Sequence, residues 1–388
     1  PMRIEFLGTC SAVPTRDRNV SSQVLSLDDG VAWMIDCGEG TQQQLLLRAQ
    51  TKLGRLQKIL VTHLHGDHVF GLPGLMCSMG MLGVGSASTS ASGSNSVADP
   101  AESEEAPEEG QFNGRILELY GPLGLARFVR QSLLLTESYM PYQFVIHQLV
   151  PPPPTNTNVD EWQVSLLQQH ESDTLHPCEL QGRLIFQSKE DHMWHLFYEN
   201  GMTVQAGFIV HKVPALGFVF QEDDIPGTLN IQKCRAMGVP NGPLLGNLKN
   251  GVPVVLPNGQ EVLPTQVMGS PLPGRKVVIL GDTQDPSAIT EACCQCDVLV
   301  HECTFGAPQR EMAIDRGHST SEMAGSFARA IGAKKLVLNH FSARFSGSAA
   351  MEEVEVLRQE AQDAFDSTEV VIAEDFLVVD IPRPKRAS

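Results

Sequence analysis

Short apolar runs that end abruptly in polar residues recur along the chain. "VAWMID" ends at Asp36, "KILVTHLH" ends in two histidines, and "KVVILGD" ends at Asp282. The runs "GFIVHKV", "DVLVHE" and "KKLVLNH" follow the same pattern. Continuous apolar runs of about four to six residues, rich in β-branched side chains, are typical of strands that are buried on both faces. We therefore predict buried strands whose trailing ends carry the polar chemistry of the protein.

Amphipathic helical patterns alternate with these strands. They are "GTQQQLLLRAQTKL", "PLGLARFVRQSLLL", "STSEMAGSFARAIGA" and "AAMEEVEVLRQEAQDAF". Alternating strands and helices predict an α/β layered fold in which helices cover packed sheets, and we expect residues 1–388 to form a single domain. Ligands of open α/β sheets gather at the carboxyl ends of the strands, where the polar residues of this chain recur.

Three stretches interrupt the pattern. Residues 83–114 are small, polar and acidic, which predicts a disordered insertion. Residues 151–190 begin with "PPPPTNTN" and are expected to be irregular. Residues 221–274 are dense in Gly and Pro, which indicates a helix-turn-hairpin excursion without a core of its own.

The composition is that of a globular protein, with 42% hydrophobic and 19% charged residues. A formal charge of −17 argues against wholesale attraction to nucleic acid. However, residues 98–110 hold six acidic residues and no basic one, so a local basic surface elsewhere remains open. The apolar stretches are too short to span a bilayer, and "PMRIEFLGTC" lacks the pattern of a signal peptide, so we expect neither a membrane protein nor a secreted one.

The nine cysteines are expected to be free thiols in a reducing compartment. Cys293, Cys294 and Cys296 crowd together, and a cysteine-based metal site there is the alternative.

The segment "KILVTHLHGDHVFGLPG" concentrates possible metal ligands. His63 and His65 point to the same side of an extended backbone, because side chains alternate along a strand. Gly66 permits a turn, so Asp67 and His68 can face a second ion. Imidazole and carboxylate together suit zinc, with manganese or iron as alternatives. The competing interpretation is a solvated loop that is rich in histidine.

Two ions need further ligands, and strand ends supply them. His211, Asp282 and His340 are each compatible with an ordinary core or loop residue. Together they complete a binuclear set in which Asp282 bridges the ions. Two neighbouring ions can activate water and stabilise both oxygens of an in-line phosphoryl displacement.

Several short motifs carry a family resemblance. The segments "FLGT", "DCGEGT", "THLHGDH", "GDT", "HECTF", "GHST" and "NHFSAR" resemble the metallo-β-lactamase superfamily. Within it, the set is similar to ribonuclease Z, the tRNA 3′-processing endonuclease, in its short form. The resemblance implies an αβ/βα four-layer sandwich with a protruding arm. It also implies a zinc-dependent endoribonuclease that removes 3′ trailers from precursor tRNA and cuts after the discriminator base to leave a 3′-hydroxyl.

The resemblance further implies residue roles. Two Zn²⁺ ions per subunit are expected, with Mn²⁺ possible. Asp67 would also be the general base, while Glu302 and His318 would protonate the leaving oxygen and position the phosphate. The alternative for His318 is a place at a helix N-terminus, capped by Ser319 or Thr320. The implied ligands are His63, His65 and His211 on one ion, Asp67, His68 and His340 on the other, and Asp282 between them.

RNA contacts are implied in three segments. The alternatives are a solvent-exposed loop with ordinary lysines for residues 221–274, a turn with surface arginines for "PTRDRN", and a surface ion pair for "HFSAR". Residues 221–274 match the arm that grips the tRNA elbow. "PTRDRN" matches the loop that senses the 3′ end, and "HFSAR" places a possible phosphate contact beyond His340. The implied residues are Lys233, Arg235, Gly242, Pro243 and Lys249 in the arm, Arg16, Arg18 and Asn19 in the loop, and Ser342 with Arg344.

The resemblance implies a homodimer in which the arm of one subunit holds the RNA that the other cleaves. No membrane partner is expected, and the location is expected to be the cytoplasm, the nucleus or both, with an organelle left open. Two rival functions remain at this point. One is a small-molecule phosphodiesterase or another hydrolase of the same superfamily, and the other is a non-catalytic RNA-binding scaffold.

Overall fold

The computed structural model describes residues 1–82, 112–153, 157–345 and 350–385. The chain forms two compact units, whereas a single domain was expected. Unit 1 comprises residues 1–198, 204–220 and 276–381, and unit 2 comprises residues 199–203, 221–275 and the segment from Pro382 onward. The predicted arm, residues 221–274, therefore makes up most of unit 2.

The first sheet of unit 1 has nine strands in the described part of the chain. Strand β1 pairs antiparallel with β18 and β2, and β2 pairs antiparallel with β3. From β3 onward the neighbours run parallel. The order is β18 (Val378–Ile381), β1 (Met2–Gly8), β2 (Ser22–Ser26), β3 (Ala32–Ile35), β4 (Leu56–Leu60), β5 (Ile116–Pro122), β6 (Gln143–Val150) and β7 (Glu179–Leu180), with β8 (Leu184–Phe186) also on β6.

The second sheet has seven strands among the described residues. Strands β14 to β17 run parallel to one another. Their carboxyl ends therefore lie at one edge, as the sequence pattern predicts. The order is β17 (Val370–Ile372), β16 (Leu336–Asn339), β15 (Val298–Glu302), β14 (Lys276–Leu280), β11 (Ala215–Glu222), β10 (Met202–Ile209) and β9 (Trp194–Glu199).

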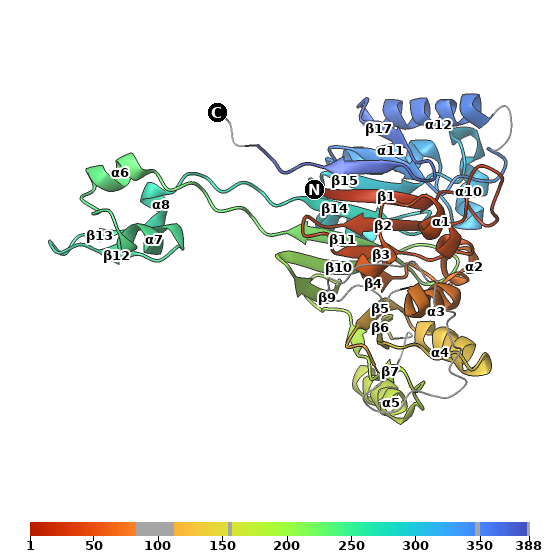
Figure 1. The fold of residues 1–388 in the computed structure, drawn as a ribbon. Helices are drawn as coiled ribbons and strands as arrows, with labels where there is room; N and C mark the ends of the chain where they lie inside the picture. Colours follow the sequence, from red (N-terminus) through yellow and green to blue (C-terminus); the bar gives the residue numbers. More distant parts are fainter. Residues whose placement is uncertain (83–111, 154–156, 346–349, 386–388) are drawn as a thin grey trace, which may run out of the picture. The chain divides into compact units, whose positions relative to one another are not determined.

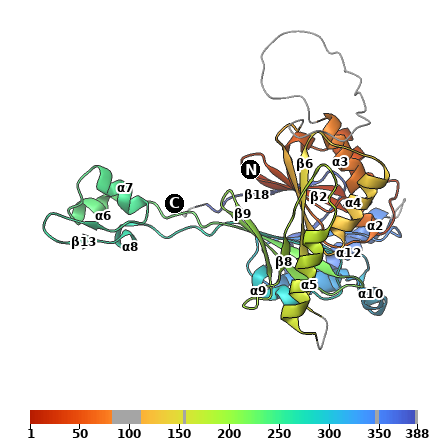
Figure 2. The same cartoon turned by 90° about the horizontal axis from the view of Figure 1, so that it is seen from below.

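Helices cover the outer faces of the two sheets (Figure 1). Helices α1 (Thr41–Leu47), α3 (Leu72–Leu82) and α4 (Leu125–Leu135) share a buried apolar cluster with the first sheet. Helices α9 (Thr290–Cys293), α11 (Ser321–Ala330) and α12 (Ala350–Phe365) do the same on the second. Figure 1 shows α12 on the opposite side from α3 and α4, and Figure 2 shows α9 on the opposite side from these two helices. Trp33 of β3 and Phe220 of β11 stack with ring centroids 6.1 Å apart, so the sheets pack face to face in four layers.

The structure bears on only one of the two stretches that were predicted to lack regular structure. Of the predicted insertion at residues 83–114, residues 83–111 lie outside the described residues. Phe112 is described, and its side chain packs on the apolar cluster of the first sheet. In the stretch 151–190, where irregular structure was predicted, helix α5 spans Val159–Ser172. The Asn158 side chain accepts hydrogen bonds from the N–H groups of Asp160 and Glu161 and so caps this helix. The irregular assignment was wrong because the four prolines precede the helix without entering it.

Unit 2 contains three short helices and a hairpin. These are α6 (Ile231–Ala236), α7 (Pro243–Lys249), α8 (Pro264–Val267), and strands β12 (Val254–Val255) and β13 (Glu261–Val262). Their apolar side chains bury one another, so the prediction of an excursion without its own core was wrong. The single apolar residues show no period in the sequence, because they are spread over several short elements and the turns between them. The buried members are Cys234, Val239, Leu248, Val254, Leu256, Val262 and Val267.

Among the described residues, no helix has the length and apolar character that crossing a membrane requires. All nine cysteines are free, as predicted. Cys293 and Cys296 are buried, and burial raises the pKa of the Cys296 thiol to about 12. In the described chain, the clusters of side chains able to hold a metal contain no cysteine, so the alternative of a cysteine site receives no support.

Candidate metal centre

The polar residues that follow the strands converge on one place in unit 1. His63 follows β4, His211 follows β10, Asp282 follows β14 and His340 follows β16. The short helix α2 (Gly66–Val69) begins directly after His65 and carries the two ligands predicted for the second ion. All seven predicted ligands fall into groups whose ligand atoms lie within 4.8 Å of one another.

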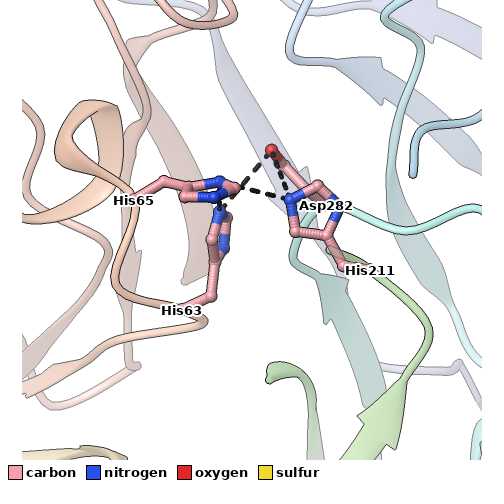
Figure 3. Close-up of side chains that lie close together, drawn as sticks. All are labelled: His63, His65, His211 and Asp282. Carbon is pink, nitrogen blue, oxygen red and sulfur yellow. Dashed lines mark hydrogen bonds and ion pairs between the residues drawn. The ribbon is translucent and has the colours of Figure 1, made fainter. Parts of the chain in front are cut away.

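The first group consists of three histidines and an aspartate. Figure 3 shows the side chains of His63, His65, His211 and Asp282 pointing toward one another. The His65 Nδ1 atom lies 3.1 Å from His63 Nε2 and 3.2 Å from His211 Nε2. Asp282 Oδ2 lies 3.6 Å from His63 Nε2 and 3.9 Å from His211 Nε2.

The second group shares Asp282 with the first. His68 Nε2 and His340 Nε2 are 3.3 Å apart, and they lie 3.6 Å and 3.5 Å from Asp67 Oδ2. The other oxygen of Asp282, Oδ1, lies 3.4 Å from His68 Nε2 and 3.3 Å from His340 Nε2. One carboxylate thus presents one oxygen to each group, which is the arrangement of a bridging ligand.

Neighbouring acceptors fix which nitrogen of each imidazole faces the centre. His68 donates its Nδ1–H to Asp36 Oδ2 at 2.7 Å, and His211 donates its Nδ1–H to the Gly317 carbonyl at 2.6 Å. His63 and His340 have the hydroxyls of Thr62 and Thr304 beside Nδ1, at 3.1 Å and 3.0 Å. Each of these four histidines therefore directs Nε2 at the centre. Metal-bound histidines are commonly oriented by such outer hydrogen bonds.

The charge balance of the site fits divalent cations. Burial lowers the pKa of His63, His65 and His211, so these imidazoles are neutral and offer lone pairs. Burial also disfavours charge on Asp282, but His340, His68 and His63 outweigh it and hold its pKa well below the ordinary value. For His68, burial is outweighed by Asp282 and Asp36, which raise its pKa well above the ordinary value. A bound cation would take the place of that proton. The donor set of imidazole and carboxylate suits zinc.

Asp67 is held by a backbone donor from a distant loop. The Ala12 N–H donates to Asp67 Oδ2 at 2.7 Å, and Ala12 has a positive φ of 62°. Burial favours the neutral acid, but the hydrogen bond from His340 and the charge of His68 lower the Asp67 pKa. A Cβ on Gly38 would lie 2.2 Å from the Asp67 carbonyl oxygen, so the loop after β3 requires glycine there.

Buried Glu302 and half-buried His318 form a pair beside the second group. His318 Nδ1 lies 2.9 Å from Glu302 Oε1 and 3.9 Å from Asp282 Oδ2. Glu302 also accepts the Thr283 N–H and the Thr304 hydroxyl, which fixes its carboxylate. Burial lowers the pKa of His318, but Glu302 and Asp282 outweigh it and raise the pKa to about 9. Thr320 caps helix α11 through the Met323 N–H, so His318 lies two residues before the helix N-cap.

The sequence reasoning did not assign the residues that orient the ligands. Asp36 accepts from the Thr62 N–H, the Thr62 hydroxyl and His68, each at 2.7 Å. Its position at the end of "VAWMID" was the available signal. Thr304, in the motif "HECTF", connects Glu302 to His340. A lone threonine in a motif gives no comparable signal, because its role depends on tertiary neighbours.

The residues of unit 1 that are predicted to contact RNA differ in how exposed their side chains are and in what they contact. Arg16 is exposed. Arg18 is turned inward, where it donates to the Thr9 hydroxyl and the Ala373 carbonyl, and Asn19 donates to the Glu39 carbonyl. Arg344 lies over the Phe305 ring and also donates to Ser342, so this arginine is near the His318 side of the centre.

The residues predicted to contact RNA in unit 2 are all exposed. They come from helices α6 and α7 and from the turn between them, where Gly242 has a positive φ of 138°. Pro243 occupies the first turn of α7, a position that proline favours. The exposed residues are Lys233, Arg235, Gly242, Pro243 and Lys249.

The chain is similar in sequence to curated proteins over its whole length. It is 39% identical to zinc phosphodiesterase ELAC protein 1 of Bos taurus, over 99% of this chain and 99% of that protein. It is 34% identical to ribonuclease Z of Streptococcus sanguinis, over 95% of this chain and 97% of that protein. A family model described as anti-Pycsar protein Apyc1 matches residues 2–82.

Solved structures share the architecture. Human tRNase Z, short form, superposes with a TM-score of 0.62 at 29% identity, covering 98% of this chain and 100% of that one. YhfI of Bacillus subtilis, a metallo-β-lactamase fold protein, gives a TM-score of 0.54 at 16% identity, over 98% of this chain and 100% of that one. The predicted metallo-β-lactamase fold is therefore confirmed. The sequence similarity to a zinc phosphodiesterase, which extends over the whole length of the chain, agrees with a metal-binding centre.

Proposed function

The chain belongs to the ribonuclease Z family, and from that premise we propose that it is an endoribonuclease that removes 3′ trailers from precursor tRNA. It cuts after the discriminator base and leaves a 3′-hydroxyl on the tRNA. The observation that carries the proposal is the bridging position of Asp282, whose two oxygens face two separate ligand groups. Such a paired site suits phosphodiester hydrolysis.

Two zinc ions, with manganese as the alternative, would be held by the two groups and would supply an activated water and stabilisation of the developing phosphate charge. In this proposal Asp67 accepts the proton of the attacking water. Burial favours its neutral acid, but the hydrogen bond from His340 and the charge of His68 lower its pKa, so the carboxylate is ionised. The Ala12 N–H holds this carboxylate in place.

In this proposal His318 donates a proton to the leaving 3′ oxygen. Its Nδ1–H is directed at Glu302, which leaves Nε2 as the nitrogen that would donate to the substrate. Glu302 is itself fixed by Thr283 and Thr304, and it therefore fixes the imidazole orientation. General acid catalysis of this kind contributes about 10²- to 10⁴-fold to a rate.

The defining experiment is incubation with a 3′-extended tRNA, with and without chelator, followed by mapping of both product ends. We expect a single cut after the discriminator, abolished by chelator and restored by zinc. Asp67→Ala should bind the precursor without cutting it, whereas Asp297→Asn, which removes an aspartate outside the centre, should cut normally. Undiminished cleavage by Asp67→Ala would overturn the mechanism.

Unit 2 supplies the proposed grip on tRNA. Lys233, Arg235 and Lys249 are exposed and would neutralise backbone phosphates, which compensates locally for the acidic chain. Glu222 pairs with Arg275 at 2.8 Å, at the start and end of this segment. Replacing residues 224–273 by an Asn-Gly turn keeps that ion pair. The shortened chain should lose tRNA cleavage but retain hydrolysis of bis-p-nitrophenyl phosphate; loss of both would show a damaged centre.

A homodimer is proposed from exposed apolar side chains on adjacent helices. Leu46 of α1, Phe70 at the end of α2 and Leu135 of α4 are 54%, 65% and 81% exposed. Helices α1 and α4 both pack on α3, and the Phe70 ring lies 6.4 Å from Phe128 of α4. Replacing Phe70 and Leu135 by Ser should give monomers in light scattering.

Mixing variants tests whether one subunit's arm serves the other's centre. The chain with residues 224–273 replaced keeps its centre, and Asp67→Ala keeps its arm. If the arm acts across the dimer, the mixture should regain tRNA cleavage that neither variant has alone. A mixture without activity, despite proven heterodimers, would assign the arm to its own subunit's centre.

A further inference from the structure

The backbone of His318 is fixed on both sides by contacts with distant segments. The carbonyl oxygen of Gly317, the preceding residue, accepts the His211 Nδ1–H at 2.6 Å. A Cβ at Gly317 would lie 2.9 Å from that nitrogen, and its φ of 80° also favours glycine. Ser319, the following residue, donates its hydroxyl to the Thr283 carbonyl at 2.6 Å. His318 therefore lies between two residues that are each bound to another part of unit 1.

The hydroxyl of Ser319 takes no part in capping the helix that follows it. Thr320 is the N-cap of α11, and its side chain accepts the Met323 N–H. Ser319 is fully buried, and its hydroxyl is directed instead at Thr283, 36 positions earlier in the chain. The contact joins the loop of His318 to the segment after β14, and helix formation does not account for it.

Thr283 connects three segments of the metal centre. It is fully buried and directly follows the bridging residue Asp282. Its hydroxyl donates to the Val210 carbonyl at 3.0 Å, and Val210 directly precedes the ligand His211. Its N–H donates to Glu302 Oε1 at 2.9 Å. Thr283 thus joins the segments that carry two metal ligands to the carboxylate that orients the imidazole of the proposed acid.

Four residues form a closed ring of hydrogen bonds and one peptide bond. Glu302 Oε1 accepts both the Thr283 N–H and the His318 Nδ1–H, each at 2.9 Å. Ser319, bonded covalently to His318, returns to Thr283 through its hydroxyl. Displacing one member would leave a buried polar group of another unpaired, which is unfavourable. The imidazole, whose Nδ1 lies 3.9 Å from Asp282 Oδ2, is thereby fixed relative to the metal centre.

We propose that Ser319 and Thr283 are positioning residues for His318 and keep its Nε2 aligned with the leaving 3′ oxygen. This inference rests on the proposed function, in which the bond between phosphorus and the 3′ oxygen breaks and that oxygen takes the proton of Nε2. Alignment governs the rate because a displacement of about 1 Å can cost about 100-fold. Both hydroxyls donate to backbone carbonyls, so their removal should impair proton donation and leave zinc binding intact.

Single-turnover cleavage of a 3′-extended tRNA measures the contribution of each hydroxyl. Ser319→Ala and Thr283→Val remove one hydroxyl each with little change in volume. Each should lower the rate constant at saturating enzyme about tenfold, a smaller loss than the about 10²- to 10⁴-fold expected for His318→Ala. The enzyme concentration at half-saturation and the zinc affinity, measured by chelator competition, should stay at the wild-type values.

Matched variants control for the loss of a hydroxyl as such. Thr283→Ser keeps the hydroxyl and should recover most of the rate that Thr283→Val loses. Ser78→Ala removes a hydroxyl of α3 that donates to the Gly74 carbonyl at 3.0 Å, away from the centre, and this variant should cut at the wild-type rate.

A precursor with sulfur in place of the 3′ oxygen at the cleaved bond distinguishes a misaligned acid from a damaged centre. A thiol has a pKa of about 8.5, so the sulfur can leave as a thiolate without a proton from His318. On this precursor the wild type, His318→Ala, Ser319→Ala and Thr283→Val should cut at nearly equal rates.

These results separate the two levels of inference. If Ser319→Ala and Thr283→Val fold like the wild type and cut the oxygen precursor as fast, or lose as much rate on the sulfur precursor as on the oxygen one, the positioning role is wrong although the proposed function stands. If His318→Ala loses as much rate on both precursors, the general-acid step of the proposed function fails, and the positioning role fails with it. If the wild type cuts neither precursor, the proposed function itself fails.

Discussion

His68 donates its Nδ1–H to Asp36 across 2.7 Å, and both side chains are almost fully buried. Helix α2 carries the histidine and the end of β3 carries the aspartate, which also accepts the Thr62 N–H. Asp36 has a positive φ of 60°, an uncommon conformation for an aspartate that the surrounding contacts hold in place. This hydrogen bond directs Nε2 of His68 toward the metal centre.

Removing Asp36 should weaken metal binding without touching a ligand. We expect Asp36→Ala to bind zinc about 10- to 100-fold more weakly, the usual loss for an orienting carboxylate. Asp36→Asn should lose less, because its amide oxygen still accepts. Competition titration with a chromophoric chelator measures the affinity. Asp297→Asn is the matched control, since Asp297 also accepts a backbone N–H, from Lys276, but lies away from the centre. Equal zinc affinity for Asp36→Ala and wild type would contradict this role.

Metal removal should destabilise the fold. Five imidazoles and two carboxylates converge in a buried place, and a cation bound only by the folded state stabilises it by mass action. Returning zinc to chelated protein at about 100 times its Kd should add about 2.7 kcal/mol to the free energy of unfolding. Thermal melts with and without zinc provide the measurement. Asp282→Ala should lose most of this gain, because both groups share that residue; an undiminished gain would argue against the bridge.

A buried histidine away from the centre should make stability depend on pH. His147 accepts the Arg183 N–H on Nδ1, and burial, with Arg183 next, lowers its pKa from 6.5 to about 4. Because the folded-state pKa lies below the unfolded value, the contribution to stability is present above pH 6.5 and is lost as pH falls through 4.

Urea melts between pH 7.5 and 4 can isolate this contribution. The stability advantage of wild type over His147→Gln should shrink by about 2 kcal/mol over that range. His195→Gln, at an exposed position, is the control. An advantage that stays constant with pH would show that His147 is not held neutral by the fold.

The glycine of "DCGEGT" should be intolerant of a side chain. In Gly38→Ala the new Cβ would lie 2.2 Å from the Asp67 carbonyl oxygen, and backbone must shift to relieve the clash. Overpacking of this kind costs about 1–3 kcal/mol, and the shift should also lower zinc affinity by displacing α2. Gly54→Ala meets nothing within 4 Å and is the control. Chemical denaturation and zinc titration of both variants measure the effects; a Gly38→Ala protein as stable as Gly54→Ala would contradict the close approach.

The local pattern of this sequence determined the strands, the main helices and the positions of the seven predicted ligands. Apolar runs that end in His or Asp specify buried strands and a polar edge, because a strand that is buried on both faces tolerates polar residues only at its ends. The prediction went wrong at α5 and in unit 2. Asn158 caps a helix directly after a proline-rich segment, and the small core of unit 2 collects single residues from separate elements.

Tertiary structure alone decided how the ligands are shared and oriented. Spacing along the chain cannot tell that Asp282 turns one oxygen to each group, because this depends on where β4, β10 and β16 end relative to β14. Nor can it show that Asp36 and Thr304 fix His68 and His340, or that Arg18 turns inward while Ser319 donates to Thr283. A sequence pattern indicates which residues of a local segment are buried. These contacts join segments that lie tens to hundreds of residues apart in the chain. Only the packing of the layers brings such segments within hydrogen-bond distance.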